Sequence, residues 1–568
     1  MINIPAILKR IRLSKNERWM LAIVALATFA RFLLMSFNWP TTNSDEGIMG
    51  LLSLHVAFQG DHPTFYYGQN YMAPLEGYLA APLFRVFGAS LFTLRLSLLP
   101  MFAAFLICMY YLTRMLYTEN FALANVMLLS LGSGAILLLQ LKAIGGYPEI
   151  ELFSALIPLL AAWLALTSYQ LRDEVPKSKR KRILIYGFFG LIVGLALWDD
   201  LLILPIIATT LLLLLLFCYR ELLSWKGLCL LLGMIVGAFP LILYNLSASW
   251  NKNSWNTLLS IQQEGAKAML AQHLTWLHHL VGTIMISLPN VSGANPACPL
   301  TSFPLYGSPT LATFPCVVFK GIWGVGYMIL LIIATYCAIR AIWRYRHVFF
   351  SQHEAFEMRQ ALIVECGRLM LLLSVILTLA SYLSSTKSAL PPVISYRYLL
   401  CALIALPVIL WPLWNGVRPG HSSSNKKTIL SLLLRGGLLL LIFLTFATGT
   451  IRTFAEIPAA QNGYQQEGAL VQNLLKIGAT RLYADYWTCN RLMFRSREQL
   501  ICSVLDDQLK PGFDRYLPYR SIVRAETHPT YVFPLGSSSA NALKQKMQSS
   551  TIPYRVYTFE GYLVYQTI

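Results

Sequence analysis

The stretch LLILPIIATTLLLLLLFC, residues 201–218, contains no charged side chain. A helix that crosses a bilayer needs about twenty apolar residues, and similar runs recur through the 568 residues of the chain. Hydrophobic residues make up 56% of the sequence and charged residues only 12%, whereas a soluble domain carries about 25% charged residues. The sequence therefore predicts a polytopic α-helical membrane protein with about eleven spans, at 19–38, 91–113, 121–141, 150–170, 183–198, 201–218, 227–247, 321–342, 367–384, 398–414 and 428–448.

Lysine and arginine are unevenly divided between the two sets of loops. If the N-terminus lies in the cytoplasm, the segments on that side hold 22 basic residues and the opposite loops hold seven. Because basic residues accumulate in cytoplasmic loops, we expect a cytoplasmic N-terminus and an extracytoplasmic C-terminal segment. Topology then accounts for most of the formal net charge of +19, and nothing in it indicates nucleic-acid binding.

Long outer segments divide the chain into two expected domains. We expect residues 1–450 to form a membrane domain. Its outer loops, 39–90 and 248–320, are longer than loops that merely connect two helices. Within the first loop, MAPLEGYLAAPLFRVFG (72–88) predicts an amphipathic helix on the membrane surface. Residues 451–568 alternate helical and strand patterns, which predicts a small extracytoplasmic α/β domain.

Four of the ten cysteines fall in these outer segments, Cys298 and Cys316 in the second loop and Cys489 and Cys502 in the tail. Each pair could close a short ring in an oxidising compartment. The alternative is four unrelated thiols.

The sequence NSDEG (43–47) places two carboxylates, Asp45 and Glu46, just beyond the outer end of the first span. Carboxylates at this position could supply a general base or bind a cation. Asn43 followed by Glu46 is also a capping-box pattern for a helix that begins here. The two interpretations are compatible, because such a cap would fix the direction of Asp45.

Two further acidic points lie at outer helix ends. Glu149 follows Gly145-Gly146-Tyr147-Pro148 and opens the fourth span; the alternative is an acid that stabilises the first helical turn. Asp199 and Asp200 separate the fifth and sixth spans, where a solvated hairpin tip is the alternative.

Lys142 and Arg397 are the basic candidates for an anionic partner on the same side. Arg397 could bind a phosphate through two N–H groups. Alternatively, it anchors its helix at the interface between Tyr396 and Tyr398.

Several of these motifs, in this order along the chain, resemble those of a known family. Arg31 inside the first span, the Asp45–Glu46 pair and the stretch YYGQNYMAPLEGYLAAPLFRVFG (66–88) are similar to the GT-C superfamily of membrane glycosyltransferases. The resemblance is to its protein O-mannosyltransferase and aminoarabinose transferase branch. The GGYPE turn (145–149) and the SYRY element (395–398) fit the same pattern. The resemblance covers spans one to ten and is strongest over residues 28–100.

The resemblance implies a hexosyl- or pentosyltransferase of the cell membrane. Such an enzyme moves a sugar, with inversion, from a polyprenyl-phosphate carrier to the hydroxyl of a glycan, lipid or protein acceptor. It implies Asp45 as the general base with Glu46 beside it, and Lys142 and Arg397 as the groups that stabilise the departing phosphate. The other residues that it places at the substrates are Glu149, Tyr147, Gln69, Tyr71 and Glu76.

One departure concerns metals. Metal-dependent members of that family commonly carry a D-x-D-like pattern, in which one residue separates the two acids, whereas Asp45 and Glu46 are adjacent. Neighbouring helical side chains diverge by about 100°, so they cannot readily share an ion. We therefore expect no required cofactor, with a divalent cation as the alternative.

Two other functions compete with glycosyl transfer. A secondary transporter or lipid flippase would place its charged site near the bilayer midplane and often shows internal repeats. Here the acids gather at one surface and no clear repeat is evident. A non-catalytic scaffold would leave this one-sided cluster unexplained.

Overall fold

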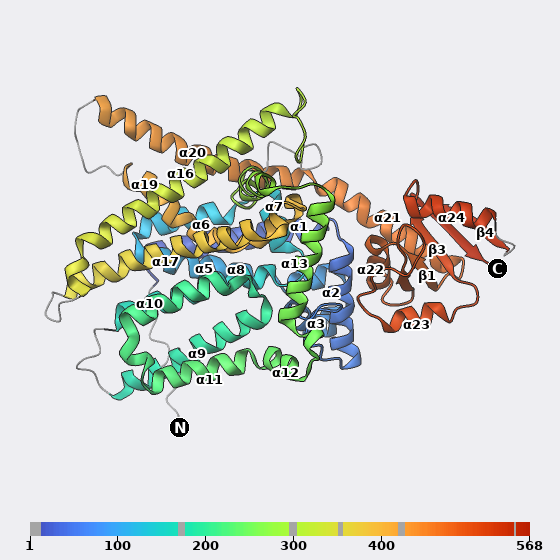
Figure 1. Cartoon of the computed structure of the whole chain (residues 1–568), viewed down its shortest axis with the longest axis horizontal. Coiled ribbons are helices and arrows are strands. Elements are labelled where there is room, and N and C mark those ends of the chain that lie inside the picture. Colours follow the sequence, from blue (N-terminus) through green and yellow to red (C-terminus); the bar gives the residue numbers. More distant parts are fainter. Residues whose placement is uncertain (1–12, 169–175, 295–303, 350–355, 418–425, 550–552) are drawn as a thin grey trace.

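The computed structural model describes residues 13–168, 176–294, 304–349, 356–417, 426–549 and 553–568. Figure 1 shows long helices gathered into one bundle and a smaller domain with a sheet at the C-terminal end. The bundle contains α1 (Lys15–Ser36), α4 (Leu91–Leu96) with α5 (Leu99–Leu116), α8 (Tyr147–Thr167), α9 (Pro176–Asp199), α10 (Leu204–Leu222), α16 (Phe314–Arg344), α17 (Phe356–Ser384), α18 (Pro392–Ser395) with α19 (Leu406–Asn415), and α20 (Lys426–Ala455).

Two further spans are bent pairs of helices. The helices α6 (Glu119–Ser130) and α7 (Gly134–Leu141) meet at 83°, and α11 (Trp225–Gly237) and α12 (Phe239–Ser247) meet at 63°. Within the described ranges, nine helices are long and apolar enough to cross a membrane, and the bent pairs raise the number to eleven. The predicted polytopic architecture is confirmed.

Glycines let two of the long helices pack closely. A Cβ atom at Gly190 of α9 would lie 2.0 Å from the carbonyl oxygen of Leu230, and one at Gly233 of α11 would lie 2.1 Å from that of Gly187. Small residues of this kind permit close contact between helices in a membrane, where no water drives them together.

Both long loops contain helices. The first forms α2 (Ser44–Leu54), which continues as a π-helical turn, and α3 (Leu75–Phe87). The helix predicted over 72–88 is thus present; it exposes Val86 and Phe87 at its C-terminal end. The second loop forms α13 (Ser254–Ala271), α14 (Trp276–Val281) and α15 (Leu288–Val291).

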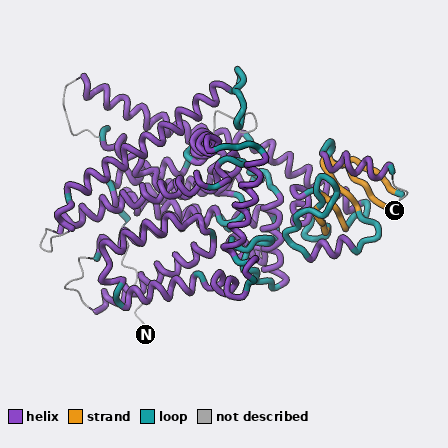
Figure 2. The backbone as a smooth tube through the Cα atoms, in the orientation of Figure 1, coloured by secondary structure: helices purple, strands orange, loops and turns teal. Residues whose placement is uncertain are grey.

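The tail folds as the predicted α/β domain (Figure 2). Its five-stranded sheet has the order β2-β1-β3-β5-β4, with β1 parallel to β2 and β3 and with β5 antiparallel to β3 and β4. The elements are α21 (Ile457–Lys476), β1 (Arg481–Ala484), α22 (Tyr486–Arg495), β2 (Ile501–Val504), α23 (Pro518–Arg524), β3 (Thr530–Pro534), α24 (Ser538–Gln548), β4 (Tyr554–Phe559) and β5 (Tyr562–Thr567).

One of the two candidate disulfides is present. Cys489 and Cys502 are bonded and tie α22 to β2, as predicted. Cys298 lies outside the described residues, so its pairing with Cys316 stays a prediction.

The tail rests directly on α2, because two glycines remove side chains from the contact. A Cβ atom at Gly47 would lie 2.6 Å from the carbonyl oxygen of Asn490, and one at Gly50 would lie 2.6 Å from the ring of Phe494. The side-chain amide of Asn490 also donates to Ser44 at 2.8 Å. The helix that carries Asp45 is therefore held between the bundle and the tail (Figure 1).

Candidate functional site

Asp45 lies in the first turn of α2, where the tail reaches it. Its Oδ1 atom accepts a hydrogen bond from the hydroxyl of Tyr486 at 2.5 Å and from Nη2 of Arg515 at 2.9 Å. The side chain is 15% exposed, and Oδ2 has no hydrogen bond to any residue that the structure describes. One oxygen therefore fixes the carboxylate and the other is free to accept a proton.

Arg515 is itself held firmly. Its Nε donates to Tyr486 at 2.6 Å, its Nη1 donates to the carbonyl of Tyr67 at 3.2 Å, and its guanidinium lies 4.7 Å from the centre of the Tyr66 ring. The hydroxyl of Tyr66 donates to the backbone carbonyl of Asp45. Residues of the first loop and the tail thus orient Asp45 together.

Glu46 points away from Asp45 into the protein. Its carboxylate forms a two-pronged ion pair with Arg95 of α4, at 2.7 and 2.6 Å, and both side chains are fully buried. Asn43 caps α2 by accepting from the Glu46 amide at 3.0 Å, so only one half of the predicted capping box forms. Both carboxylate oxygens accept hydrogen bonds from Arg95, and Oε1 also accepts one from the Ala143 amide. This arrangement suits Glu46 to positioning the surrounding segments, whereas the prediction gave it a catalytic role.

Lys142 follows α7 and is 6% exposed. Its ammonium group makes no hydrogen bond or ion pair with the residues in the described ranges. Burial lowers the pKa of Lys142 to about 8, while the charges of Glu46 and Asp45 oppose that change. A buried cation that lacks a direct partner among the described residues and lies within electrostatic range of Glu46 and Asp45 is suited to binding an anion.

The Gly145-Gly146 turn connects Lys142 to α8. Both glycines have positive φ, 111° and 74°, which L side chains rarely adopt. Glu76 of α3 is fully buried and accepts from the Gly145 amide at 3.0 Å. Burial and the nearby Glu149 raise the pKa of Glu76 well above its usual range.

Glu149 and Asp199 lie close to the same turn. A Cβ atom at Gly146 would lie 3.3 Å from Oδ2 of Asp199. All four carboxyl oxygens of these two buried residues lack a hydrogen-bond partner among the described residues. Buried polar groups normally have hydrogen-bond partners, so a bound substrate could supply the partners that these carboxyl groups lack.

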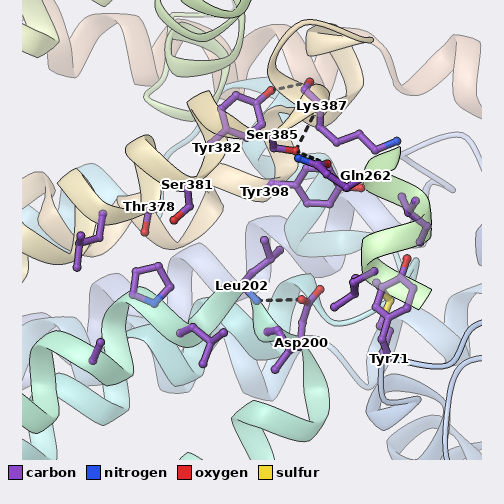
Figure 3. Close-up of a pocket in the computed structure, with 18 residues that line it drawn as sticks. Tyr71, Asp200, Leu202, Gln262, Thr378, Ser381, Tyr382, Ser385, Lys387 and Tyr398 are labelled. Atoms are coloured by element: carbon purple, nitrogen blue, oxygen red, sulfur yellow. Dashed lines mark hydrogen bonds between the residues drawn. The ribbon is translucent and has the colours of Figure 1, made fainter. Parts of the chain in front are cut away.

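A cavity of about 540 Å³ opens between α10, α13 and α17 (Figure 3). Half of the 18 residues that line it are apolar, mainly leucine, isoleucine, proline and alanine, and most of the polar ones gather at one end. Figure 3 shows Asp200 and Tyr71 on one side of that end and Gln262 and Tyr398 on the other. The polar lining residues are Tyr71, Asp200, Gln262, Thr378, Ser381, Tyr382, Ser385, Lys387 and Tyr398.

Arg397 is next to this polar end. Its guanidinium lies 5.7 Å from the centre of the Tyr147 ring and 5.3 Å from that of Tyr398, and its Nε is buried without a partner in the part of the chain described. Burial raises the pKa of Asp200 to about 6, and Arg397 opposes that rise. The structure therefore places Tyr71 in the cavity wall and brings Arg397 and Tyr147 together beside Tyr398, another residue of that wall.

The remaining predicted residue, Gln69, lies in the turn between Tyr66 and Tyr71. Its backbone N–H donates to the Tyr66 carbonyl, and its buried side-chain Oε1 has no partner within the described ranges. Its contact with a substrate stays a prediction.

Several residues of the site were not predicted. Arg95 is a charged residue inside the second span, a feature that marks functional or structural sites in membranes and could have been recognised. Lys387 was counted only as an outer basic residue. Nothing in the sequence points to Tyr486 and Arg515, because they lie 441 and 470 positions from Asp45.

The two carboxylates at the start of α2 each face an arginine. Among the residues that the structure describes, no three histidine, cysteine, aspartate or glutamate side chains are arranged to hold a metal ion. The Oδ1 atom of Asp45 faces Arg515, and the carboxylate of Glu46 faces Arg95.

Comparison with solved structures identifies similar folds over nearly the whole chain. The archaeal oligosaccharyltransferase AglB from Archaeoglobus fulgidus, in complex with an inhibitory peptide and a dolichol-phosphate, has 11% identity and a TM-score of 0.47, with 96% of this chain and 74% of that chain covered. ArnT from Cupriavidus metallidurans has 13% identity and a TM-score of 0.46 in the apo state, with 97% and 98% covered. The same protein bound to undecaprenyl phosphate has 14% identity and a TM-score of 0.46.

No protein-family profile and no curated protein sequence matches the chain. At identities below 25% and TM-scores below 0.5, this structural likeness carries no conclusion about family or activity. The function is therefore argued from the site.

Proposed function

We propose that the chain is a GT-C-type glycosyltransferase that moves a sugar from a polyprenyl-phosphate donor to an acceptor hydroxyl on the extracytoplasmic face. The observation that carries the proposal is Asp45, a carboxylate with one oxygen held by Tyr486 and Arg515 and the other without a partner among the described residues. The buried Lys142, which forms no ion pair within the described ranges, lies within electrostatic range of it. The apolar cavity with its polar end supports a donor that is part lipid and part phosphate.

In the proposed reaction, Oδ2 of Asp45 removes the proton of the acceptor hydroxyl. The acceptor oxygen attacks the anomeric carbon, and the bond from that carbon to the phosphate oxygen breaks on the opposite face. The electron pair leaves with the polyprenyl phosphate, so the configuration inverts. Lys142 and Arg397 stabilise the charge that grows on the phosphate, an effect worth about 3–4 kcal/mol for one well-placed group in other enzymes.

The cavity between α10 and α17 is suited to the carrier lipid. Each methylene group that leaves water contributes about 0.8 kcal/mol, and aliphatic side chains of α10 and α13 form the apolar part of the wall. A chain that enters along Ala208 and Leu204 would bring its phosphate to the end marked by Arg397 and Lys387. We further propose metal-independent catalysis, because Asp45 pairs with Arg515 and Glu46 pairs with Arg95, which leaves neither carboxylate positioned to share a cation.

The proposal is tested by turnover in lipid nanodiscs. The full chain receives polyprenyl-phosphate sugars of several types with a mixture of glycan, lipid and peptide acceptors, and released polyprenyl phosphate is measured. We expect acceptor-dependent release with at least one donor. Absence of release with every donor, together with uptake of a solute into sealed vesicles, would establish transport instead.

The pH dependence of the reaction tests Lys142. Because the pKa of Lys142 is lowered to about 8, the side chain loses its charge above that pH, and kcat/KM, which reports the free enzyme, should fall there. Lys142→Arg keeps its charge to much higher pH and should remove this alkaline decline. An identical decline in Lys142→Arg would show that another group causes it.

A bulky residue in the cavity tests the lipid assignment. Ala208→Trp fills the space beside α10 and should raise KM for a long-chain donor at least tenfold, while a donor with a short prenyl chain is affected less. Leu212→Trp lies one turn along the same helix, outside the cavity and 47% exposed, and should leave both values unchanged. Equal effects on long and short donors would contradict the assignment.

A further inference from the structure

A second, smaller cavity lies between the tail and the first outer loop. It has a volume of about 140 Å³, enough for a few water molecules at about 30 Å³ each or for one compact anion. Gly47 of α2 contributes to its wall. Gly47 is two residues from Asp45, about 200° around the helix, so this cavity and the proposed base are on different faces of α2. The lining residues are Thr42, Gly47, Ala89, Ser90, Leu91, Tyr464, Glu467, Arg491, Phe494, Arg495 and Arg497.

The charges of this cavity are not balanced. Three arginines face one carboxylate, and only Arg491 pairs with it, at 3.1 Å from Glu467. Arg491 also donates to Tyr562 and to the carbonyl of Trp487, so its guanidinium is fully engaged. Arg495 and Arg497 form no ion pair with any residue in the described part of the chain.

Arg495 is held in place although none of the described residues gives it an anionic partner. Its guanidinium lies 3.5 Å from the centre of the Tyr464 ring, a cation–π contact that uses the face of the guanidinium and none of its N–H groups as hydrogen-bond donors. The side chain is half-buried, and burial lowers the pKa of Arg495. A fixed guanidinium with unused donors is suited to a phosphate, whose oxygens match its geometry.

We infer that this cavity binds a phosphoryl group through Arg495 and Arg497. The ligand has two chemically equivalent sources. The headgroup of an anionic phospholipid is one, because Val86 and Phe87 are exposed a few residues before the lining residues Ala89–Leu91 and such apolar side chains enter the membrane interface. A phosphate in solution or on a polar acceptor is the other.

Binding would join the two parts of the molecule. Arg495 and Arg497 belong to the tail, whereas Ser90 and Gly47 belong to the first outer loop. An anion between them would hold α22 on α2 and so preserve the contact of Arg515 with Asp45. The site is separate from the donor cavity, and its occupancy does not depend on the proposed sugar transfer.

Thermal unfolding of the full chain in nanodiscs tests this inference and separates the two sources. In phosphatidylcholine nanodiscs, inorganic phosphate is added against chloride at equal ionic strength. In a second series, part of the phosphatidylcholine is replaced by phosphatidylglycerol without added phosphate. A rise of Tm in the first series assigns a soluble or acceptor-borne phosphate, and a rise only in the second assigns a lipid headgroup.

Variants decide whether the response comes from this cavity. Arg495→Gln with Arg497→Gln should abolish the rise of Tm and weaken the apparent affinity at least tenfold. Arg481→Gln with Arg524→Gln removes the same charge elsewhere on the tail and should respond as the unchanged protein does. Should the first pair prevent folding, Arg497→Gln alone, at an exposed position, should still weaken binding severalfold. A response that is absent in the unchanged protein, or equal in both pairs of variants, would overturn the inference.

Discussion

Asp45→Asn is expected to lower kcat/KM by about 10²- to 10⁴-fold, the range in which a positioned base contributes to catalysis. Asparagine has almost the same shape as aspartate, and its side-chain oxygen can still accept from Tyr486 and Arg515. The contact between α2 and the tail should therefore persist, while the basic Oδ2 atom is replaced by an amide nitrogen that cannot take a proton. The measurement is release of polyprenyl phosphate under conditions that give separate kcat and KM values.

Two comparisons isolate the chemical role of Asp45. Asp507→Asn makes the same substitution at a tail carboxylate that accepts a hydrogen bond from Ser539 of α24, and it should leave turnover unchanged. Arg515→Met should lower kcat by about 10² or less, because the base then loses its orientation but keeps its basicity. Turnover of Asp45→Asn within a few-fold of the unchanged protein would remove Asp45 from the role of base.

The spans and most of the tail could be predicted because their signals are local. A run such as 201–218 needs only its own hydrophobicity to specify a spanning helix, and the alternating patterns at 554–559 and 562–567 predict β4 and β5 as the structure has them. The short α23 was not predicted, since it has seven residues and too little sequence for a periodic pattern. The run 121–141 reads as a straight span but bends by 83°, and Gly132 and Ser133 are the only local sign of the break.

The site depends on contacts that a single sequence does not contain. Asp45 could be singled out by its place beyond the first span, but the groups that orient it come from the tail, and no local pattern links positions 45 and 515. The direction of Glu46 likewise depends on the packing of α4 against α2. The adjacency of two acids suggested a shared role, whereas the helix turns one towards the tail and the other into the core.

Substitution of Glu46 in its buried ion pair with Arg95 is expected to lower both stability and turnover strongly. Glu46→Gln leaves the Arg95 guanidinium fully buried without its counter-charge, and removal of one partner from such a pair costs about 3–5 kcal/mol. The Oε1 atom of Glu46 also accepts from the Ala143 amide at 3.4 Å, so the substitution loosens the segment that carries Lys142. We expect both a lower free energy of unfolding, followed by tryptophan fluorescence in detergent, and a loss of turnover.

A double variant separates the stability cost of an unpaired buried charge from the effect of Glu46 on the position of its neighbours. Glu46→Met with Arg95→Met removes both charges, and apolar replacement of a buried pair is often neutral or stabilising, so stability should return to within about 1 kcal/mol of the unchanged protein. The exposed pair of Arg114 and Glu119 (2.7 Å) serves as the control, since Glu119→Gln should cost about 1 kcal/mol or less. Turnover should stay low in the double variant, because neither methionine holds the Ala143 amide or the orientation of Asp45. Additive losses of stability from the two single substitutions would instead show that the pair contributes nothing as a pair.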